Sequence, residues 1–375
     1  MKTKILMILL SIFCLDVFGQ NIHVQLQNSE TQKPIPQVTI FTSDMGEMFT
    51  SNDNGEIVMP ESLVGKTFYT EDYEYVPSKQ TIQNISPVIW NLTPNSETLE
   101  EIVIYKRPLK EVLLEVINHS EETMSKNMKL NTYYREDFIK DGSVYAFAEG
   151  LMDFYVGSKN KEIFNLVNQS RAVAIEQREE DFGDVIIDPN TLIKMVLKFH
   201  LLKDLINDKN YEFSVFSKKL GDRDLRICYI QPTEKAKKRF LRNGYFIFDE
   251  DKKLVLEYEF SFDENKKIHN KPINIVIAKF NFKDMQVKAK YLDAAQAYYP
   301  THSNVVYDII INSKLAKVNK YRSHGQAFFY TIGFNKIDKI PYEKESFNQK
   351  TLFSLGDNFT EEFWLNPTLQ NFSKQ

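Results

Sequence analysis

The residues best able to do chemistry lie in two neighbouring predicted strands. Tyr134, Arg135 and Glu136 belong to the first strand, and Glu149 belongs to the second. If Asp141-Gly142 forms a two-residue hairpin turn, Tyr134 faces Glu149 and Glu136 shares their face, while Arg135 points away. Two carboxylates beside a tyrosine could transfer protons or hold a cation.

A second register of the same hairpin gives these residues a structural role. If Gly142 is the left-handed residue of a three-residue loop, Arg135 and Glu149 become diagonal neighbours and form an ion pair. The sequence favours this ion pair over the acid/base arrangement. The four residues Tyr134, Arg135, Glu136 and Glu149 are still the predicted ligand-binding surface, because the sequence offers no other intact polar constellation.

Other motifs with a chemical meaning are weaker, and the sequence predicts no catalytic residue, no metal site and no cofactor. His119 and Glu122 match the His-x-x-Glu zinc pair of metallocarboxypeptidases, but no third ligand lies near them in the sequence. Asp181-Phe182-Gly183 lacks the partner motifs of a kinase, and no Gly-x-Ser-x-Gly elbow occurs. The acidic stretch 176–188 is predicted to be a loop, with calcium binding as the less favoured alternative.

The first 19 residues have the pattern of a cleavable export signal. Two lysines precede an apolar run from Ile5 to Leu15, which is too short to span a bilayer. Small residues predict cleavage after Gly19, whereas lipid attachment at Cys14 is the competing interpretation. Export would place the mature chain in the periplasm, on the outer-membrane surface or outside the cell, with no transmembrane segment after signal removal.

Composition and charge exclude one class of partner. The 375 residues include 47 Lys and Arg and 51 Asp and Glu, so the chain lacks the broad basic surface of a nucleic-acid binder. One basic cluster, at residues 235–242, is interpreted as the solvated edge of a strand. Cys228 is the single cysteine beyond Cys14, so no intramolecular disulfide can form after cleavage.

Residues 20–104 alternate between short apolar runs and turn clusters, which is the pattern of an antiparallel β-sandwich. Ile22, Val24 and Leu26 form one such alternation. Asn52 to Glu56 contains the residues that tolerate a left-handed bend, and its spacing favours a hairpin turn over a calcium loop.

Four stretches of this first domain carry a family resemblance. They are Pro34-Ile35-Pro36 with Val38, Thr50 to Ile57, Asp72 to Tyr75, and Ile89 to Leu92. Together they resemble the carboxypeptidase regulatory-like domain, which implies a β-sandwich module. Gln37 departs from the glycine that usually follows the proline pair. Leu99 to Ile104 is similar to the segment that follows this domain in many envelope proteins of Gram-negative bacteria.

A linking helix and a second β-rich domain follow. Apolar residues recur every three or four positions from Leu109 to Met124, so an amphipathic helix is predicted within 105–128. Residues 129–375 are predicted to form a larger antiparallel β domain with a few helices. Its clearest strand is Leu254–Phe262, and its longest helical pattern runs from Pro189 to Ile206. The predicted fold class is therefore mainly β.

Resemblance also guides the prediction of function. Tyr133 to Glu136 with Glu149 is similar to the start of an uncharacterised β-rich domain that envelope proteins couple to the regulatory-like module, and 244–262 loosely resembles half-barrel lipoprotein carriers. These resemblances imply an exported, non-enzymatic cell-envelope protein that binds or scaffolds an envelope polymer, an apolar ligand or a partner protein. A hydrolase-like enzyme using Glu136 and Glu149 is the alternative. A deep apolar cavity would favour carriage, and a filled core with a charged face would favour a scaffold.

Overall fold

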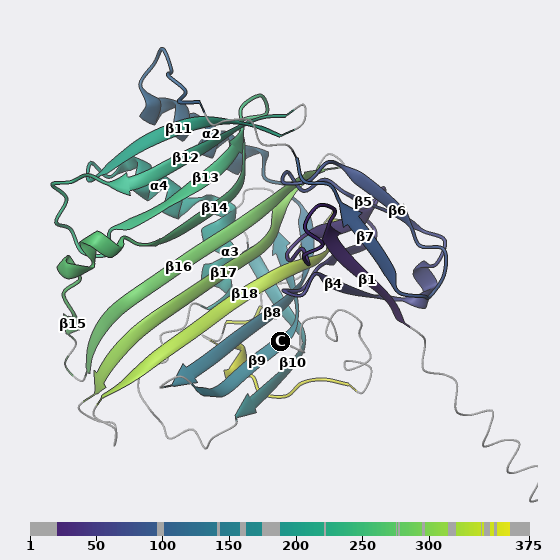
Figure 1. Ribbon diagram of the computed structural model, residues 1–375. Coiled ribbons are helices and arrows are strands. Elements are labelled where there is room, and N and C mark those ends of the chain that lie inside the picture. The colour runs from purple at the N-terminus through teal and green to yellow at the C-terminus, as the bar shows by residue number, and fades with distance from the viewer. Residues whose placement is uncertain are drawn as a thin grey trace, which may run out of the picture.

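The computed structural model describes residues 21–95, 101–140, 143–157, 163–174, 188–220, 223–274, 276, 278–294, 297–313, 320–338, 340, 346–348 and 351–360. The predicted export signal with Cys14, and the acidic residues from Glu176 to Asp184, lie outside this set. The described residues form two β-rich parts that lie side by side (Figure 1). The mainly β, antiparallel fold class is confirmed.

The N-terminal part is a sandwich of two small sheets. One sheet has the order β4 (Glu56–Pro60), β1 (Asn21–Asn28), β7 (Val88–Leu92). The other has the order β3 (Met48–Thr50), β2 (Thr39–Thr42), β5 (Thr67–Thr70), β6 (Ser78–Thr81), and the short 3-10 helix η1 (Glu61–Leu63) precedes β5. The expected antiparallel sandwich is present with one parallel pair, β1 and β7, because the chain returns to β1 from the second sheet.

The core of the sandwich and its first hairpin follow from the sequence pattern. Ile22, Val24 and Leu26 are buried in one cluster with Trp90 of the neighbouring strand β7 and Phe68 of the facing sheet. The predicted turn before β4 is confirmed, since the side chain at position 52 accepts two backbone hydrogen bonds of 2.9 Å within it. The glycine of that turn has a left-handed φ of 73°.

The larger part is one curved antiparallel sheet. In the described residues its order is β10 (Ile163–Ala174), β9 (Ser143–Val156), β8 (Met128–Lys140), β18 (Lys320–Lys336), β17 (Ala297–Ser313), β16 (Ala278–Ala294), β14 (Leu254–Phe262), β13 (Arg242–Asp249), β12 (Arg223–Pro232) and β11 (Tyr211–Leu220), with β15 (Ile273–Asn274) beside β16. The predicted strand Leu254–Phe262 is confirmed. Because β8 pairs with β18, the first and last strands of this part meet in the middle of the sheet.

Three helices cover one face of this sheet, which we call the inner face, and the opposite face is the outer face. They are α2 (Leu109–Thr123), α3 (Pro189–Lys198) and α4 (His200–Asn207), which lie behind the strands in Figure 1. Their apolar sides and the inward side chains of the strands form one continuous buried cluster. Ser120 of α2 accepts a hydrogen bond of 2.9 Å from the backbone N–H of Val255, which ties that helix to β14.

The helical stretch after Pro189 is broken, although one helix to Ile206 was predicted. Asp188 caps α3 by accepting a 2.9 Å hydrogen bond from the N–H of Thr191. Phe199 then takes a left-handed φ of 50° and ends α3. Its ring is buried and stacks on Tyr291 with centroids 5.0 Å apart. Burying a phenylalanine contributes about 1.5–3 kcal/mol, which offsets the roughly 1–2 kcal/mol cost of the left-handed residue.

Irregular segments cover both outer strands of the large sheet. At β11, the N–H of Val103 donates to Val215 O at 2.8 Å, so the segment after the sandwich runs along this edge. At β10, Ser170 and Asn358 exchange two backbone hydrogen bonds of 2.8 and 3.0 Å. Unpaired edge strands tend to associate with other chains, and here both edges have partners.

Candidate functional site

The hairpin of β8 and β9 separates the four sequence-predicted site residues. The turn closes with Lys140 opposite Ser143, and a β-bulge then shifts the register by one residue. As a result Arg135 lies directly opposite Glu149, which is neither of the two registers considered from the sequence. Tyr134 and Glu136 point to the inner face, whereas Arg135 and Glu149 point to the outer face.

On the outer face Glu149 is the centre of a cationic and aromatic cluster. Its side chain is 0% exposed, and it accepts a 2.6 Å hydrogen bond from the hydroxyl of Tyr133. It forms ion pairs with Arg171 and, at 3.8 Å, with Arg135. Both guanidinium groups also lie over the ring of Phe147, about 5 Å from its centre. The ion pair favoured from the sequence is therefore present.

On the inner face Glu136 has different partners. It accepts hydrogen bonds from the Tyr134 hydroxyl at 3.1 Å and from the backbone N–H of Phe353 at 2.7 Å. Burial and the nearby carboxylate hold the pKa of Tyr134 well above its ordinary range. The two glutamates thus lie on opposite sides of one sheet, so they do not form the carboxylate pair that the enzyme alternative requires. Ligand binding by the four residues stays a prediction.

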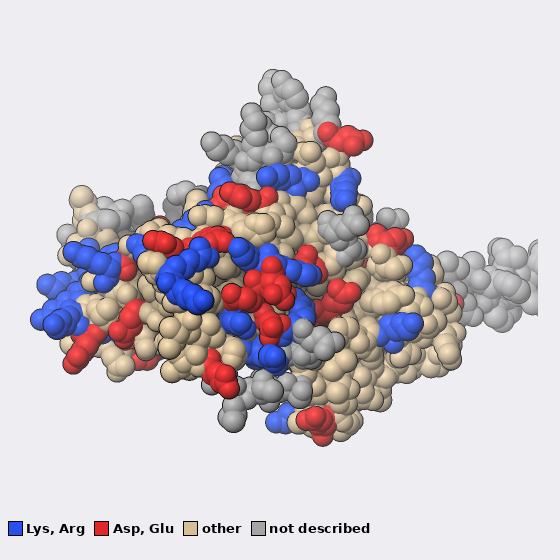
Figure 2. Space-filling model, turned by 90° about the horizontal axis from the view of Figure 1, so that it is seen from above, with Lys and Arg blue, Asp and Glu red and all other residues tan. Residues whose placement is uncertain are grey.

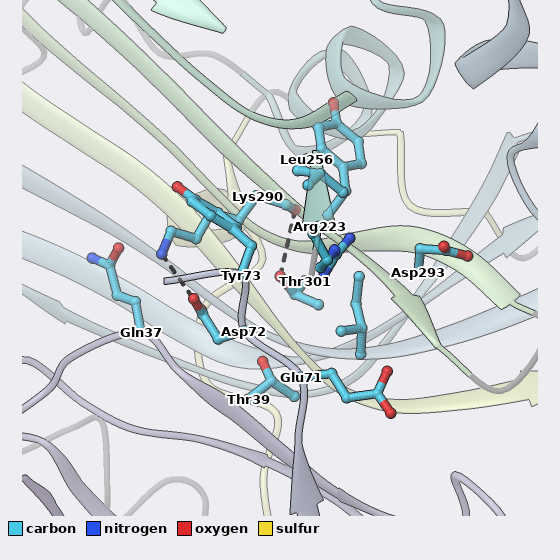
Figure 3. Close-up of a pocket in the computed structure, with 12 residues that line it drawn as sticks. Gln37, Thr39, Glu71, Asp72, Tyr73, Arg223, Leu256, Lys290, Asp293 and Thr301 are labelled. Carbon is cyan, nitrogen blue, oxygen red and sulfur yellow. Dashed lines mark hydrogen bonds and ion pairs between the residues drawn. The ribbon is translucent and has the colours of Figure 1, made fainter. Parts of the chain in front are cut away.

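A second polar cluster, absent from the sequence prediction, joins the sandwich to the outer face. Lys290 of β16 lies 3.5 Å from Glu257, 3.6 Å from Glu74 and 3.7 Å from Asp72. Tyr73 donates a 2.7 Å hydrogen bond to Glu257, and Lys290 lies over the tyrosine ring. Figure 3 shows Lys290 and Asp72 pointing toward each other across this junction. Sandwich residues thus cover part of the outer face of the large sheet at β14 and β16.

The ionisation of this junction follows from its contacts. Burial opposes the charge on Lys290, but the three carboxylates around it raise its pKa above the ordinary value. Burial likewise opposes ionisation of Glu257, yet the neighbouring lysines and two tyrosine hydroxyls lower its pKa. Lys290 and Glu257 therefore form a buried ion pair, which depends on both partners being present, whereas burial raises the pKa of Glu74.

His302 of β17 lies at the rim of this junction. It is 2% exposed, and its ring stacks on Tyr330 with centroids 4.5 Å apart. Its Nδ1 lies 3.2 Å from Phe329 O, while its Nε2 has no hydrogen-bond partner among the residues that the structure describes. Burial, followed by the positive charges of Lys288 and Lys290, lowers its pKa to about 3. The imidazole is therefore neutral at physiological pH.

The cavity beside Lys290 is too small for an organic ligand. It holds about 30 Å³ between Asp72, Tyr73 and Lys290 on one side and Asp293 and Thr301 on the other (Figure 3). A single water needs roughly 10–15 Å³ of such volume. The junction is therefore best described as an electrostatic contact between the two β-rich parts.

A much larger groove opens beside α4. Its volume is about 470 Å³, within the roughly 300–1,000 Å³ typical of small-molecule sites. Its lining comes from α4, the start of β11, the loop before β13 and the first residue of β13: Leu201, Asp204, Leu205, Asn207, Asp208, Tyr211, Lys238, Phe240 and Arg242. Apolar, cationic and acidic side chains therefore line the same groove.

Arg242 is the unusual residue of this groove. The guanidinium lies over the ring of Phe262 and donates to Met285 O at 3.3 Å. Among the described residues no carboxylate lies within ion-pair distance of it, and Asp284 attracts it only from further away. Burial lowers the pKa of Arg242 below its ordinary value. Lys238, by contrast, is neutralised by Asp208 at 2.6 Å.

One residue of this groove, Arg242, already stood out in the sequence. Arg242 belongs to the basic cluster that was interpreted as a solvated strand edge, but the loop 233–241 carries most of that cluster and Arg242 is partly buried. An arginine in the first position of an aromatic strand is a weak indication of a buried cation. The contribution of α4 comes from distant residues and has no local signal.

Comparison with known proteins gives little further information. No protein-family model matches the sequence, so the resemblance of 20–104 to the carboxypeptidase regulatory-like domain stays a prediction. No curated protein matches it either. Within the described part of the chain, no helix is long and apolar enough to cross a bilayer, and no three His, Cys, Asp or Glu side chains are grouped to hold a metal.

Solved structures give distant similarities. A DUF1329 family protein from Desulfovibrio piger has 9% identity and a TM-score of 0.27, over 60% of this chain and 94% of that one. A LolA superfamily protein from Nitrosomonas europaea has 7% identity and a TM-score of 0.21, over 61% of this chain and 94% of that protein. Lipovitellin, in a structure describing its lipid–protein interactions, has 8% identity and a TM-score of 0.27, over 58% of this chain and 26% of lipovitellin. TM-scores of this size do not define a shared fold.

Proposed function

We propose that this chain is an exported, non-enzymatic binding protein of the cell envelope, and that its groove beside α4 holds an amphipathic anion. Such a ligand has an apolar chain and one carboxylate or phosphate group. The observation that carries the proposal is the Arg242 guanidinium, which lines a partly apolar groove and has no carboxylate within ion-pair distance among the described residues. The export signal predicted at residues 1–19 supports the location.

The walls of the groove suit the apolar part of this ligand. Leu201 and Leu205 come from α4, and Phe240 faces them from the loop before β13. Phe240 is fixed in place because its ring contacts Phe262 and Phe282, with centroids 5.5 and 5.6 Å away. A preformed wall costs little ordering free energy when a ligand binds.

The cationic end suits the anionic group. A buried charge without a partner is costly, so a guanidinium in this position gains from an anion that enters the groove. Arg242 already donates through Nη1 to Met285 O and through Nη2 to Met285 Sδ, and the remaining N–H groups of its planar fork can meet the oxygens of one ligand group. Lys238 is held by Asp208 and contributes less to the net charge of the site.

Two further observations favour binding in a surface groove over catalysis and over a ligand enclosed by the large sheet. Glu136 and Glu149, the carboxylates of the enzyme alternative, lie on opposite faces, and Glu149 is neutralised by arginines. The inner face packs against α2, α3 and α4 in one continuous cluster. A groove at the margin of that cluster is therefore the better place for an apolar chain than the middle of the sheet.

Titration with dansyl-labelled undecanoate, followed by its fluorescence, tests this proposal. Arg242→Met keeps the stem packing and removes the charge. A charge-assisted hydrogen bond is worth about 1.5–3 kcal/mol, so affinity should fall roughly tenfold to 100-fold. Lys235→Met, from the same loop but outside the groove lining, should bind like the wild type. Equal affinity of Arg242→Met and Lys235→Met, with both variants folded by circular dichroism, would overturn the proposal.

A further inference from the structure

We propose that one corner of the large sheet docks onto an anionic lipid bilayer. The corner consists of the 3-10 helix η2 (Glu264–His269), the chain from there to β15, Val276, and the loop 233–241. In Figure 1 it lies at the left end of the sheet, far from the sandwich. This inference does not depend on what the groove binds.

Aliphatic side chains project from this corner into solvent. Ile268 is 81% exposed and Val276 is 88% exposed, and Ile273 between them is also exposed. Isolated exposed apolar residues are common on proteins, but these three lie within nine residues of sequence on a short helix and the turn that follows. Side chains exposed to this degree contribute little to folding.

Basic side chains share this corner with the exposed aliphatic residues. The loop and η2 are in direct contact, because Lys266 Nζ donates to Glu234 O at 2.7 Å and the N–H of Phe240 donates to Asn270 Oδ1 at 2.7 Å. Figure 2 shows Lys and Arg gathered at this left end of the molecule. The basic residues of the corner include Lys235, Lys237, Lys238, Arg239, Lys266 and Lys271.

The positive charge of this corner indicates an anionic partner. The chain as a whole carries a net charge of −4, whereas residues 234–242 contain five basic residues and one acidic residue. No ion pair is described for Lys235, Lys237, Arg239 or Lys271, so these charges are available to a partner. Exposed aliphatic side chains in a basic corner match the boundary between acyl chains and anionic headgroups. A soluble acidic protein would need the lysines but not Ile268 and Val276.

Co-sedimentation with vesicles tests the inference on the intact chain. Vesicles of phosphatidylcholine alone are compared with vesicles that also contain phosphatidylglycerol. Each basic residue near an anionic surface strengthens binding about fivefold, so Lys235→Glu with Lys271→Glu should weaken binding by about 25-fold or more. Ile268→Ser with Val276→Ser should weaken it without changing the charge. High salt should release the wild type.

Matched variants on the sandwich provide the controls. Lys33→Glu with Lys79→Glu makes the same charge change at two exposed lysines, and Ile89→Ser removes an aliphatic side chain that is 61% exposed. Both should bind the anionic vesicles like the wild type. The inference is overturned if the wild type fails to pellet with either vesicle, or if the sandwich variants lose as much binding as the corner variants. Vesicle binding that needs the lysines but not Ile268 and Val276 overturns docking through the aliphatic side chains, because electrostatic attraction to the headgroups would then account for it.

Discussion

The buried neutral His302 should make the stability of the fold depend on pH. In an unfolded chain a histidine takes up its proton near pH 6.5, whereas burial and Lys288 and Lys290 lower the pKa of His302 to about 3. At a pH between these two pKa values the imidazole binds a proton in the unfolded state but not in the native state. The stability contributed by this group is therefore fully present above pH 6.5 and is lost as the pH falls below it.

The size of the effect of His302 follows from the two pKa values. At pH 5 the unfolded imidazole is almost fully protonated and the native one is not, which lowers the free energy of unfolding by about 2 kcal/mol. Urea denaturation at pH 8 and pH 5, followed by far-UV circular dichroism, measures this loss. His302→Gln removes the titrating group, so its loss between the two pH values should be about 2 kcal/mol smaller than that of the wild type.

Charged and aromatic groups beside His302 also affect stability, and the comparison of variants separates their effect from that of His302. Glu257, Lys288, Lys290 and Tyr330 face its ring and are shared by the wild type and the Gln variant. As a control, His23→Gln changes an exposed histidine of β1 and should keep the wild-type pH dependence. The reasoning fails if His302→Gln and the wild type lose the same stability, or if NMR shows the His302 imidazole titrating near pH 6.5.

Two further substitutions test packing and charge. Lys290→Met strands the buried Glu257 and should cost about 3–5 kcal/mol in urea denaturation, whereas Lys253→Met, at a half-exposed pair with Glu115, should cost far less. Gly325→Ala places a Cβ 2.2 Å from the Tyr307 ring and should lower stability by about 1–3 kcal/mol in the same assay. Gly46→Ala meets only ordinary contacts at 3.4 Å and should be close to neutral.

Local pattern predicted the single elements well. The strand Leu254–Phe262 has the predicted bounds, because its alternation reports directly on which side chains face the helices. The linking helix also lies where its three- and four-residue spacing placed it. The break at Phe199 was missed because its cause is the ring of Tyr291, which lies far away in the sequence.

The candidate sites were harder to predict because their geometry is set by long-range contacts. A one-residue bulge in the β8–β9 hairpin decides which face carries Arg135, and neither of the two turn types considered contains it. The Lys290 junction joins residues near positions 73, 257 and 290, and nothing in the local sequence couples them. The division of the chain into domains at residue 104 stays a prediction.

The covered edges of the large sheet restrict how a partner can recognise this protein. Peptides often bind by adding a strand to a free sheet edge, where main-chain hydrogen bonds provide affinity with little demand on sequence. Here the segment through Val103 already fills this role at β11, and the segment through Asn358 fills it at β10. A strand-like ligand must first displace a piece of the same chain along these stretches. Recognition should therefore depend on side chains of the loops and faces, which discriminate between partners more strictly than backbone pairing does.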